Sequence, residues 1–215
     1  NKEYRTCCNC SYNVCHRFCI VNTLYIEEIW KDKMFFHLEE EGSREEMCFD
    51  AKYYDTEDWA LSNEEMAYRV RKEGSNWVAS LKWKGHTEGA LHVREELNVP
   101  VADSTPDPGV FRGSEIGVHL EEVIAGRPLI CQIETKYHRR RFRIDTGDGL
   151  YELSLDDGWI ITPYGQERIL EVELELFSGE TEELEKLGAS ICEKYGLEKE
   201  EISKYARGLE LINKG

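Results

Sequence analysis

The chain is short of positive charge and of long apolar segments. It contains 27 Lys and Arg against 43 Asp and Glu, which gives a formal net charge of -16. Binding nucleic acid over a broad surface normally requires a basic footprint, so we expect no nucleic-acid partner. No apolar run approaches the roughly 20 residues of a membrane helix, so we also expect no membrane span.

Several signature motifs are missing as well. The first residues do not combine a charged segment with an apolar core, as a secretory signal does, so the sequence predicts a cytoplasmic protein with reduced thiols. No Gly-x-Ser-x-Gly turn supports a serine nucleophile. The histidines are scattered without metal-ligand spacing. The sequence leaves a homodimer open.

Cysteine is unevenly distributed. Five of the eight cysteines lie near the start, at Cys7, Cys8, Cys10, Cys15 and Cys19. Their spacing could hold tetrahedral zinc, but it lacks the two separated pairs of established zinc motifs, and ordinary reduced thiols are the alternative. Because the composition shifts near residue 24, we treat residues 1–24 as an atypical Cys-rich opening and 25–215 as the main domain.

Charged residues occupy every second position in five stretches that read as β-strands. Successive strand side chains point to opposite faces, so each set lies on one face, and the intervening residues are largely apolar. A solvated face of an antiparallel sheet would give this alternation. The other interpretation is a sheet surface that holds a polyanion with metal ions. The sets are Arg69 and Arg71; Lys82 and Lys84; Arg94 and Glu96; Glu152 and Asp156; and Glu171, Glu173 and Glu175.

One short segment concentrates positive charge in this acidic chain. It contains Lys136, Arg139, Arg140, Arg141 and Arg143. Dispersed lysines would serve solubility equally well, so the clustering favours a local anion site.

Strand-like runs and tight turns dominate the main domain. The runs favour an antiparallel meander or closed barrel. Turn signals include Gly147-Asp148-Gly149 and Asp156-Asp157-Gly158. Helical spacing appears at 25–34, 116–124 and 181–195, with Thr181 as an expected N-cap. The expected strands cover 48–55, 67–71, 77–83, 91–99, 132–144, 150–155, 159–162 and 170–177.

Seven segments in this order together resemble a known family, the CYTH domains or triphosphate tunnel metalloenzymes. The matching segments are Tyr53 to Asp58; Tyr68-Arg69-Val70-Arg71 with Trp77 to Lys82; Arg94-Glu95-Glu96; Lys136 with its arginines; Tyr151 to Gly158; Glu171 to Glu175; and Ser203 to Gly208. The resemblance covers residues 49–212. It implies a mainly β (α+β) fold, an antiparallel eight-stranded β-barrel tunnel with flanking helices.

The resemblance also implies the site and its chemistry, hydrolysis of a small-molecule triphosphate with Mg²⁺ or Mn²⁺. Hard carboxylate oxygens suit these ions, and fixed cations neutralise the transferring phosphoryl group. By matching position, Lys82, Arg94 and Lys136 would be catalytic. Substrate binding would involve these three with Arg69, Arg71, Arg140, Lys204 and Arg207, and metal binding would involve Glu96, Asp156, Glu171 and Glu173.

The start of the chain departs from the family pattern. Family members usually open with a strand that reads Glu-x-Glu-x-Lys, whose carboxylates help to bind the metal. The comparable spacing here is Asn1, Glu3 and Arg5, so residues 1–24 would hold a degenerate first strand with Glu3, and Asn1 beside it, as metal ligands. The alternatives are a truncated or corrupted start, a degenerate working site, or a protein that binds triphosphate without cleaving it.

The substrate is open within the family. Members include inorganic triphosphatases, thiamine triphosphatases and one class of adenylate cyclase. We expect inorganic tripolyphosphate, because no feature marks an adenine or thiazolium pocket. Thiamine triphosphate and ATP are the alternatives, with Trp59, Trp77, Trp83 or Trp159 as residues that could stack on a ring.

Overall fold

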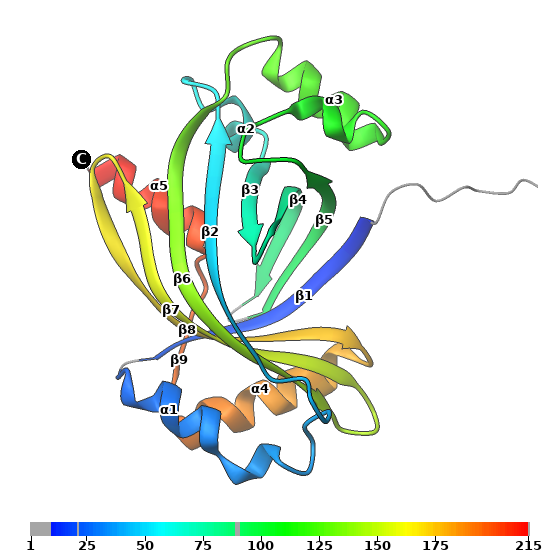
Figure 1. Ribbon diagram of the computed structural model, residues 1–215, viewed down its shortest axis with the longest axis vertical. Helices are drawn as coiled ribbons and strands as arrows, with labels where there is room; N and C mark the ends of the chain where they lie inside the picture. The colour runs from blue at the N-terminus through cyan, green and yellow to red at the C-terminus, as the bar shows by residue number, and fades with distance from the viewer. Residues whose placement is uncertain (1–9, 21, 89–90, 215) are drawn as a thin grey trace, which may run out of the picture.

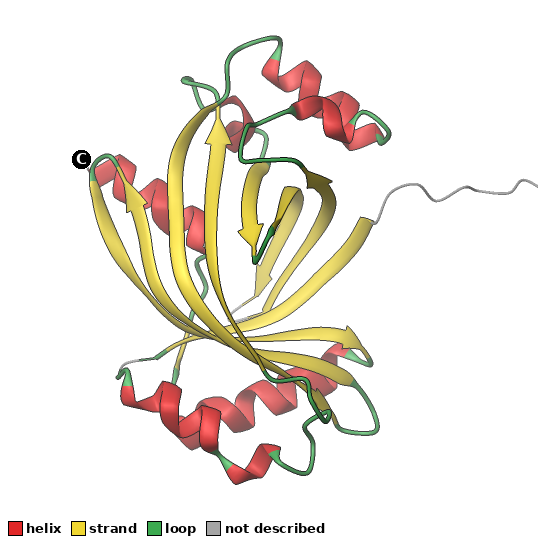
Figure 2. Cartoon of the chain, in the orientation of Figure 1, coloured by secondary structure: helices red, strands yellow, loops and turns green. Residues whose placement is uncertain are grey.

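A closed antiparallel β-barrel forms the body of the protein (Figures 1 and 2). The computed structural model describes residues 10–20, 22–88 and 91–214. The strands follow the order β5-β4-β3-β2-β6-β7-β8-β1, and pairing of β1 with β5 closes the ring of eight. This confirms the predicted fold. The strands are β1 (Cys10–Cys19), β2 (Glu45–Asp55), β3 (Ala67–Glu73), β4 (Asn76–Glu88), β5 (Leu91–Val101), β6 (Ile130–Asp145), β7 (Leu150–Thr162), β8 (Gly165–Ser178), and a short β9 (Glu198–Lys199) beside β1.

The barrel has an apolar outer face and a largely polar inner face. On β8, Val172 and Leu174 point outward and are fully buried, whereas Glu173 and Glu175 between them line an interior cavity. The outer face needs a cover of helices, because exposed apolar rows of this size would be unstable in water. Helices accordingly lie against both ends of the barrel (Figure 2).

The larger outer core lies under α1 (Leu24–Lys31), η1 (Lys33–Phe35) and α4 (Thr181–Tyr195). These elements cover β6, β7 and β8 at one end of the barrel (Figure 1). Phe142 of β6 is fully buried there, with its ring centroid 5.8 Å from that of Trp30 and 5.2 Å from that of Phe35. This packing anchors the first helix to the barrel.

The second outer core lies over β3, β4 and β5. It is covered by α2 (Ala60–Asn63), η2 (Pro108–Phe111) and α3 (Glu115–Ile124). The fully buried Phe111 packs edge-on against Tyr68 of β3, with ring centroids 5.7 Å apart. Ser114 is the N-cap of α3, and its hydroxyl accepts a hydrogen bond from the Gly117 amide.

The last helix, α5 (Lys204–Lys214), packs against the inward faces of β6, β7 and β8. Tyr205 stacks on Tyr53 of β2 with ring centroids 5.2 Å apart. Gly208 lies so close to Ile133 that an added Cβ would come within 2.7 Å of its side chain. Glycine therefore lets α5 reach into the barrel, which brings Lys204 to the cavity.

Two local expectations from the sequence were wrong. Asp156-Asp157-Gly158 is not a turn, because β7 runs unbroken through it. Gly158 is needed for close packing instead, since a Cβ there would lie 2.1 Å from the Lys136 carbonyl oxygen. The N-cap of α4 is Glu180 rather than Thr181, and it makes no side-chain capping hydrogen bond.

The opening of the chain supplies β1, which closes the barrel between β5 and β8. The expected first-strand residues Asn1, Glu3 and Arg5 lie outside the described residues. The inward positions of β1 are taken by Asn13, Cys15 and Arg17. Among the described helices, none is long and apolar enough to cross a membrane.

We predict that Phe142→Ala lowers the free energy of unfolding by about 3–5 kcal/mol, because it leaves a cavity between β6 and the first helix. Urea denaturation followed by circular dichroism measures the change. Phe36→Ala is the matched control, since Phe36 is 55% exposed and should cost less than about 0.5 kcal/mol. Equal losses for the two variants would contradict the described packing of α1 and η1.

Candidate active site

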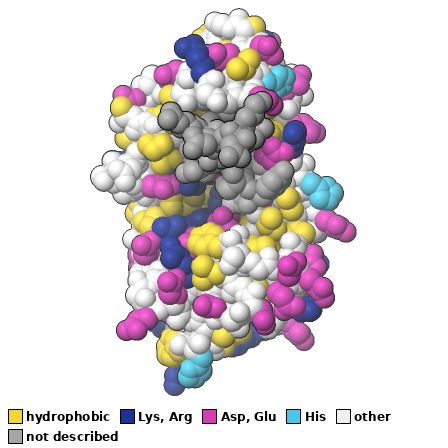
Figure 3. Space-filling model, turned by 90° about the vertical axis from the view of Figure 1, so that its right-hand side faces the viewer, with side chains coloured by type: hydrophobic (Ala, Val, Ile, Leu, Met, Phe, Trp, Pro, Cys, Tyr) yellow, Lys and Arg dark blue, Asp and Glu magenta, His cyan; other side chains and the backbone are white. Residues whose placement is uncertain are grey.

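The barrel encloses a cavity of about 290 Å³ whose lining is dominated by charge. Among the described residues, eight Lys and Arg side chains and five Glu side chains line it, although the whole chain is acidic. Lys and Arg side chains are visible in the middle of one face of the molecule in Figure 3. The cationic residues are Arg17, Arg69, Arg71, Lys82, Arg94, Arg139, Arg141 and Lys204.

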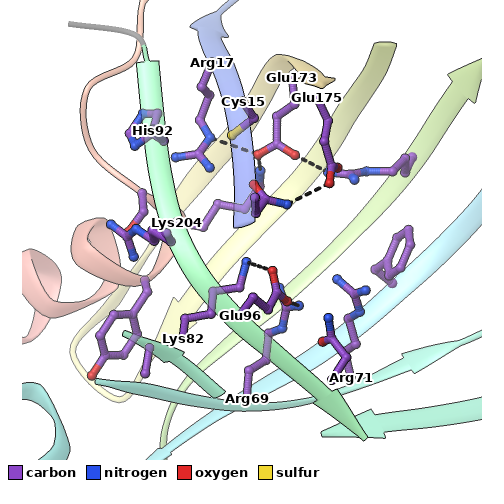
Figure 4. A pocket seen from close by; sticks show the side chains of 18 of the residues that line it. Cys15, Arg17, Arg69, Arg71, Lys82, His92, Glu96, Glu173, Glu175 and Lys204 are labelled. Atoms are coloured by element: carbon purple, nitrogen blue, oxygen red, sulfur yellow. Dashed lines mark hydrogen bonds and ion pairs between the residues drawn. The ribbon is translucent and has the colours of Figure 1, made fainter. Parts of the chain in front are cut away.

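One wall of the cavity combines cations from β3, β4 and β5 (Figure 4). The Nζ of Lys82 lies 2.9 Å from a Glu96 oxygen, and a terminal nitrogen of Arg69 lies 3.5 Å from the other Glu96 oxygen. Burial alone would raise the pKa of Glu96, but the charges of Lys82 and Arg69 outweigh it and lower the pKa to about 2. Glu96 is thus ionised and orders the cations of this wall.

Two arginines on the same side have pKa values lowered by burial and by neighbouring cations. Burial and then the charge of Arg69 lower the pKa of Arg71, and burial and then the charge of Arg17 lower the pKa of Arg94. Arg71 pairs with Glu73, whereas among the described residues Arg94 has no ion-pair partner and the Nε atom of Arg69 is buried without an acceptor. Such an excess of buried donors favours binding of an anion.

The opposite wall contains a cluster of three carboxylates, Asp156, Glu171 and Glu173, which we call the acidic triad. One oxygen from each lies within 4.8 Å of the others, and both Asp156 and Glu171 are fully buried. Three hard oxygen donors at this spacing fit a divalent ion such as Mg²⁺ or Mn²⁺. Among the residues that the structure describes, this is the one group with metal-ligand geometry, and it includes no cysteine.

Buried cations contact the acidic triad closely. The Nζ of Lys204 lies 2.9 Å from Asp156, 2.7 Å from Glu171 and 2.9 Å from Glu173. Arg139 pairs with Asp156 at 2.6 Å and with Glu173 at 2.5 Å. Burial would raise the pKa of Glu173, but Lys204, Arg139 and Arg17 hold it well below the ordinary value.

β1 contributes a cation to this wall. The Nε of Arg17 lies 2.9 Å from Glu173 and 3.6 Å from Glu171. Beside it, burial raises the pKa of the Cys15 thiol to about 11, so the thiol is protonated at neutral pH. Asn13 donates a hydrogen bond to Glu175 at 2.7 Å.

Most of the predicted site residues meet in or beside the cavity. Arg69, Arg71, Lys82, Arg94, Glu96, Glu173 and Lys204 line it, and Asp156 and Glu171 lie directly behind it in contact with Lys204. Arg207 lies further back, where it contacts Glu171 and pairs with Glu167 at 2.5 Å. Arg207 therefore supports Glu171 rather than facing the cavity.

Lys136 and Arg140 do not belong to this assembly. The side chain of Lys136 is 52% exposed and pairs with Glu134, and that of Arg140 contacts Glu27 and Glu46. Both lie on the outer face of β6, because the inward positions are Tyr137, Arg139 and Arg141. The alternation of side chains along β6 therefore corrects the prediction that Lys136 and Arg140 bind phosphate in the cavity.

Sequence reasoning missed Arg17, Arg139 and Arg141 as cavity residues. For β6 a usable signal exists, because Phe142 and Ile144 belong to the apolar outer row and place the odd-numbered arginines inside. For Arg17 the polar-apolar alternation of β1 is present. The residue types of β1 alone, however, do not indicate that Arg17 lies beside Glu171 and Glu173.

A family model for the CYTH domain matches residues 41–209, which is most of the chain. The chain belongs to the CYTH domain family. The named resemblance is thereby confirmed, and the cavity described above lies inside its CYTH barrel. Metal dependence is general in this family, which agrees with the donor set of the acidic triad.

Similar proteins include hydrolases of triphosphate. An inorganic triphosphatase of Haemophilus influenzae is 29% identical over 133 residues, which are 61% of this chain and 37% of that protein. The chain thus spans little more than a third of that relative. An adenylyl cyclase candidate from Hippeastrum with a dominant triphosphatase activity has the same fold, with a TM-score of 0.67, 15% identity, and coverage of 92% of this chain and 95% of that one. A Pyrococcus horikoshii OT3 protein also shares it, with a TM-score of 0.56, 18% identity, and coverage of 92% and 98%.

His92 links the cavity to the chain after α4 and gives the CYTH domain a pH-sensitive contact. Its Nε2 donates to the Glu200 carbonyl oxygen at 2.9 Å, and its Nδ1 lies 3.3 Å from the Thr87 hydroxyl. Burial and then the charge of Arg17 lower the pKa of His92 from 6.5 to about 4. Folding therefore favours the neutral ring.

We predict that the unfolding free energy falls between pH 6.5 and pH 4, because there the unfolded chain protonates His92 and the folded chain does not. Between pH 7.5 and pH 5 the loss from this residue should be about 2 kcal/mol. Urea denaturation at both pH values should show that His92→Gln removes this part of the slope. His119→Gln, at an exposed site, should keep it; identical slopes for wild type and His92→Gln would contradict the assignment.

Proposed function

We propose that this domain hydrolyses triphosphate with a divalent metal ion, and that inorganic tripolyphosphate is the substrate. The observation that carries the proposal is the meeting of two groups in one enclosed cavity, a wall of incompletely paired arginines and lysines and an acidic triad. A linear polyphosphate needs both, since its oxygens require cations along their length and its reacting phosphorus requires charge neutralisation.

The arginine wall supplies the anion-binding part of the mechanism. Arg69, Arg71 and Arg94 offer planar groups that can contact two phosphate oxygens at once, whereas Lys82 acts as a point charge. A charge pair at 4 Å is worth about 1 kcal/mol in water but about 4 kcal/mol at an effective dielectric constant near 20. Enclosure in the barrel thus strengthens each contact.

Asp156, Glu171 and Glu173 are the residues that would hold Mg²⁺ or Mn²⁺. A bound ion supplies charge neutralisation on the transferred phosphoryl group and orients oxygen atoms around it. Glu96, which the family resemblance also suggests as a metal ligand, lies between Lys82 and Arg69 on the other wall. Its role in this proposal is to position those two cations.

The lining of the cavity supports a small inorganic substrate. Its aromatic members are Phe49, Tyr53, Tyr137, Phe177 and Tyr205, and no tryptophan is among the described lining residues. Of the four candidates from the sequence, Trp77 and Trp83 pack in the second outer core, and Trp59 and Trp159 are not among the lining residues, so stacking on an adenine or thiazolium ring has no support from them. Thiamine triphosphate and ATP, with thiamine triphosphatase or adenylate cyclase activity, are the substrate alternatives to assay.

A second candidate function is binding of triphosphate without cleavage. The observation that favours it is β1, whose described inward side chains are Asn13, Cys15 and Arg17. None of these is a hard anionic ligand, so within the described residues the metal would depend on the acidic triad. Tight binding of tripolyphosphate without release of phosphate would support this function.

The test is phosphate release from tripolyphosphate with Mg²⁺ or Mn²⁺. We predict that Glu173→Gln lowers kcat at least about 100-fold, because it removes one charge from the metal ligands. Arg94→Ala should raise KM about 10- to 100-fold, because a charge-assisted hydrogen bond to phosphate is lost. Thiamine triphosphate and ATP are measured in parallel, with cyclic AMP as a second product assay for ATP.

Exposed residues provide matched controls. Glu182→Gln on α4 and Arg112→Ala beside η2 should leave kcat and KM within about twofold, since their side chains are 77% and 71% exposed. Activity that survives Glu173→Gln would contradict the proposed metal site. A larger rise in KM for Lys136→Ala than for Arg139→Ala would contradict the assignment of the inner face of β6.

A further inference from the structure

The ammonium group of Lys204 lies at the centre of the acidic triad. It contacts one oxygen of each carboxylate at 2.7–2.9 Å, and Lys204 as a whole is only 7% exposed. Burial would lower the pKa of Lys204, but Glu171, Glu173 and Asp156 hold it well above the ordinary value. The lysine is therefore charged and fully engaged with the residues that fit a metal ion.

The charges around the triad are already balanced. Arg17 and Arg139 each contact two of its carboxylates, and Lys204 contacts all three. Arg207 also contacts Glu171, but Glu167 balances its charge, so three further cations face the three anions. A divalent ion that entered without any rearrangement would leave two uncompensated positive charges in a buried site, which is strongly unfavourable.

The space between the three carboxylates also excludes binding of a metal ion without rearrangement. A Mg²⁺ ion binds oxygen at about 2.0–2.1 Å. The triad oxygens all lie within 4.8 Å of one another, and the Lys204 nitrogen is at hydrogen-bond distance from one oxygen of each carboxylate. The ion and the ammonium group would require the same position between the three carboxylates, so they cannot both occupy it.

The cavity offers a second position for the ammonium group of Lys204. It also lines the cavity, where Lys82 and Arg94 reach in from the opposite wall. Its four-carbon stem starts at the first residue of α5, and its Nζ lies 5.4 Å from the ring centre of Tyr137. Rotation of the side chain can therefore turn the ammonium group from the triad towards an anion in the cavity.

We propose that Lys204 is an exchangeable cation that couples the two halves of the site. A divalent ion displaces it from the acidic triad, and a triphosphate anion in the cavity accepts it. The exchange rests on the proposed function, because it requires that a divalent ion and a triphosphate both bind in this site. It adds that each of the two ligands promotes binding of the other. The coupling is reciprocal, as for any two linked ligands.

The first experiment measures Mn²⁺ binding by calorimetry in the absence of phosphate. Lys204→Met should bind Mn²⁺ at least about tenfold more tightly than the wild type, because the competing ammonium group is gone. Lys186→Met, at a 60% exposed lysine of α4, is the control and should bind as the wild type does. Glu173→Gln in the Lys204→Met background should lose the gain, which places the ion at the triad.

The second experiment measures binding of a methylene-bridged triphosphate, which cannot be hydrolysed. In the wild type, saturating Mn²⁺ should tighten binding about tenfold relative to EDTA. In Lys204→Met the same comparison should give less than about threefold, since the metal no longer releases a cation to the anion.

The melting temperature provides a further readout, and a second substitution at the same position guards against a defect that is specific to one variant. Without Lys204 the triad has one uncompensated charge, so Mn²⁺ should raise the melting temperature of Lys204→Met, and of Lys204→Gln, more than that of the wild type. The exchange would be overturned if Mn²⁺ raised the melting temperature of neither variant more than that of the wild type. Equal Mn²⁺ affinities of the wild type and Lys204→Met would also overturn it.

The two proposals fail separately. Phosphate release with no metal-anion coupling would leave the proposed hydrolysis intact and remove the exchange. Coupling with no phosphate release would retain the exchange in a protein that binds triphosphate without cleaving it.

Discussion

Burial of many charges inside a closed barrel is the constraint on which the rest of this structure depends. Removing one ion from water costs several kcal/mol, and loss of one partner from a buried pair typically costs about 3–5 kcal/mol. The interior is stable because its charges are matched, as in the contacts of Lys204 with all three triad carboxylates. Where the matching is incomplete, at Arg94 and at the Nε of Arg69, the cavity has the electrostatic character of an anion site.

A charged interior also determines where the hydrophobic core lies. Apart from the inner cluster that packs against α5, the apolar side chains of the strands point outward, so most of the core lies between the barrel and the helices that cover it. Phe142 and Tyr68 belong to these outer cores, while residues one position away face the cavity. Because the core is outside, the inner surface is free to carry functional groups on rigid strands rather than on loops. Of the helices that the structure describes, α5 alone enters the barrel, and it brings Lys204 with it.

The barrel was predictable because period-two alternation is strong where one face of each strand is apolar and covered. The same alternation located Arg69, Lys82 and Glu173 on the inner face. It did not locate Arg17, because the function of a position in β1 depends on which residues it meets across the barrel, and pairing with β5 and β8 is not encoded locally. Lys136 was misplaced because matching by residue type was given more weight than the outward row that Phe142 defines.

The central claim is that the enclosed cations and carboxylates form a binding site for a triphosphate. The most direct test is the melting temperature of the protein with saturating tripolyphosphate and Mg²⁺. A ligand at 100 times its dissociation constant stabilises the folded state by about 2.7 kcal/mol, so we expect a rise of several degrees that is much smaller in Arg94→Ala. An unchanged melting temperature of the wild-type protein would contradict the account.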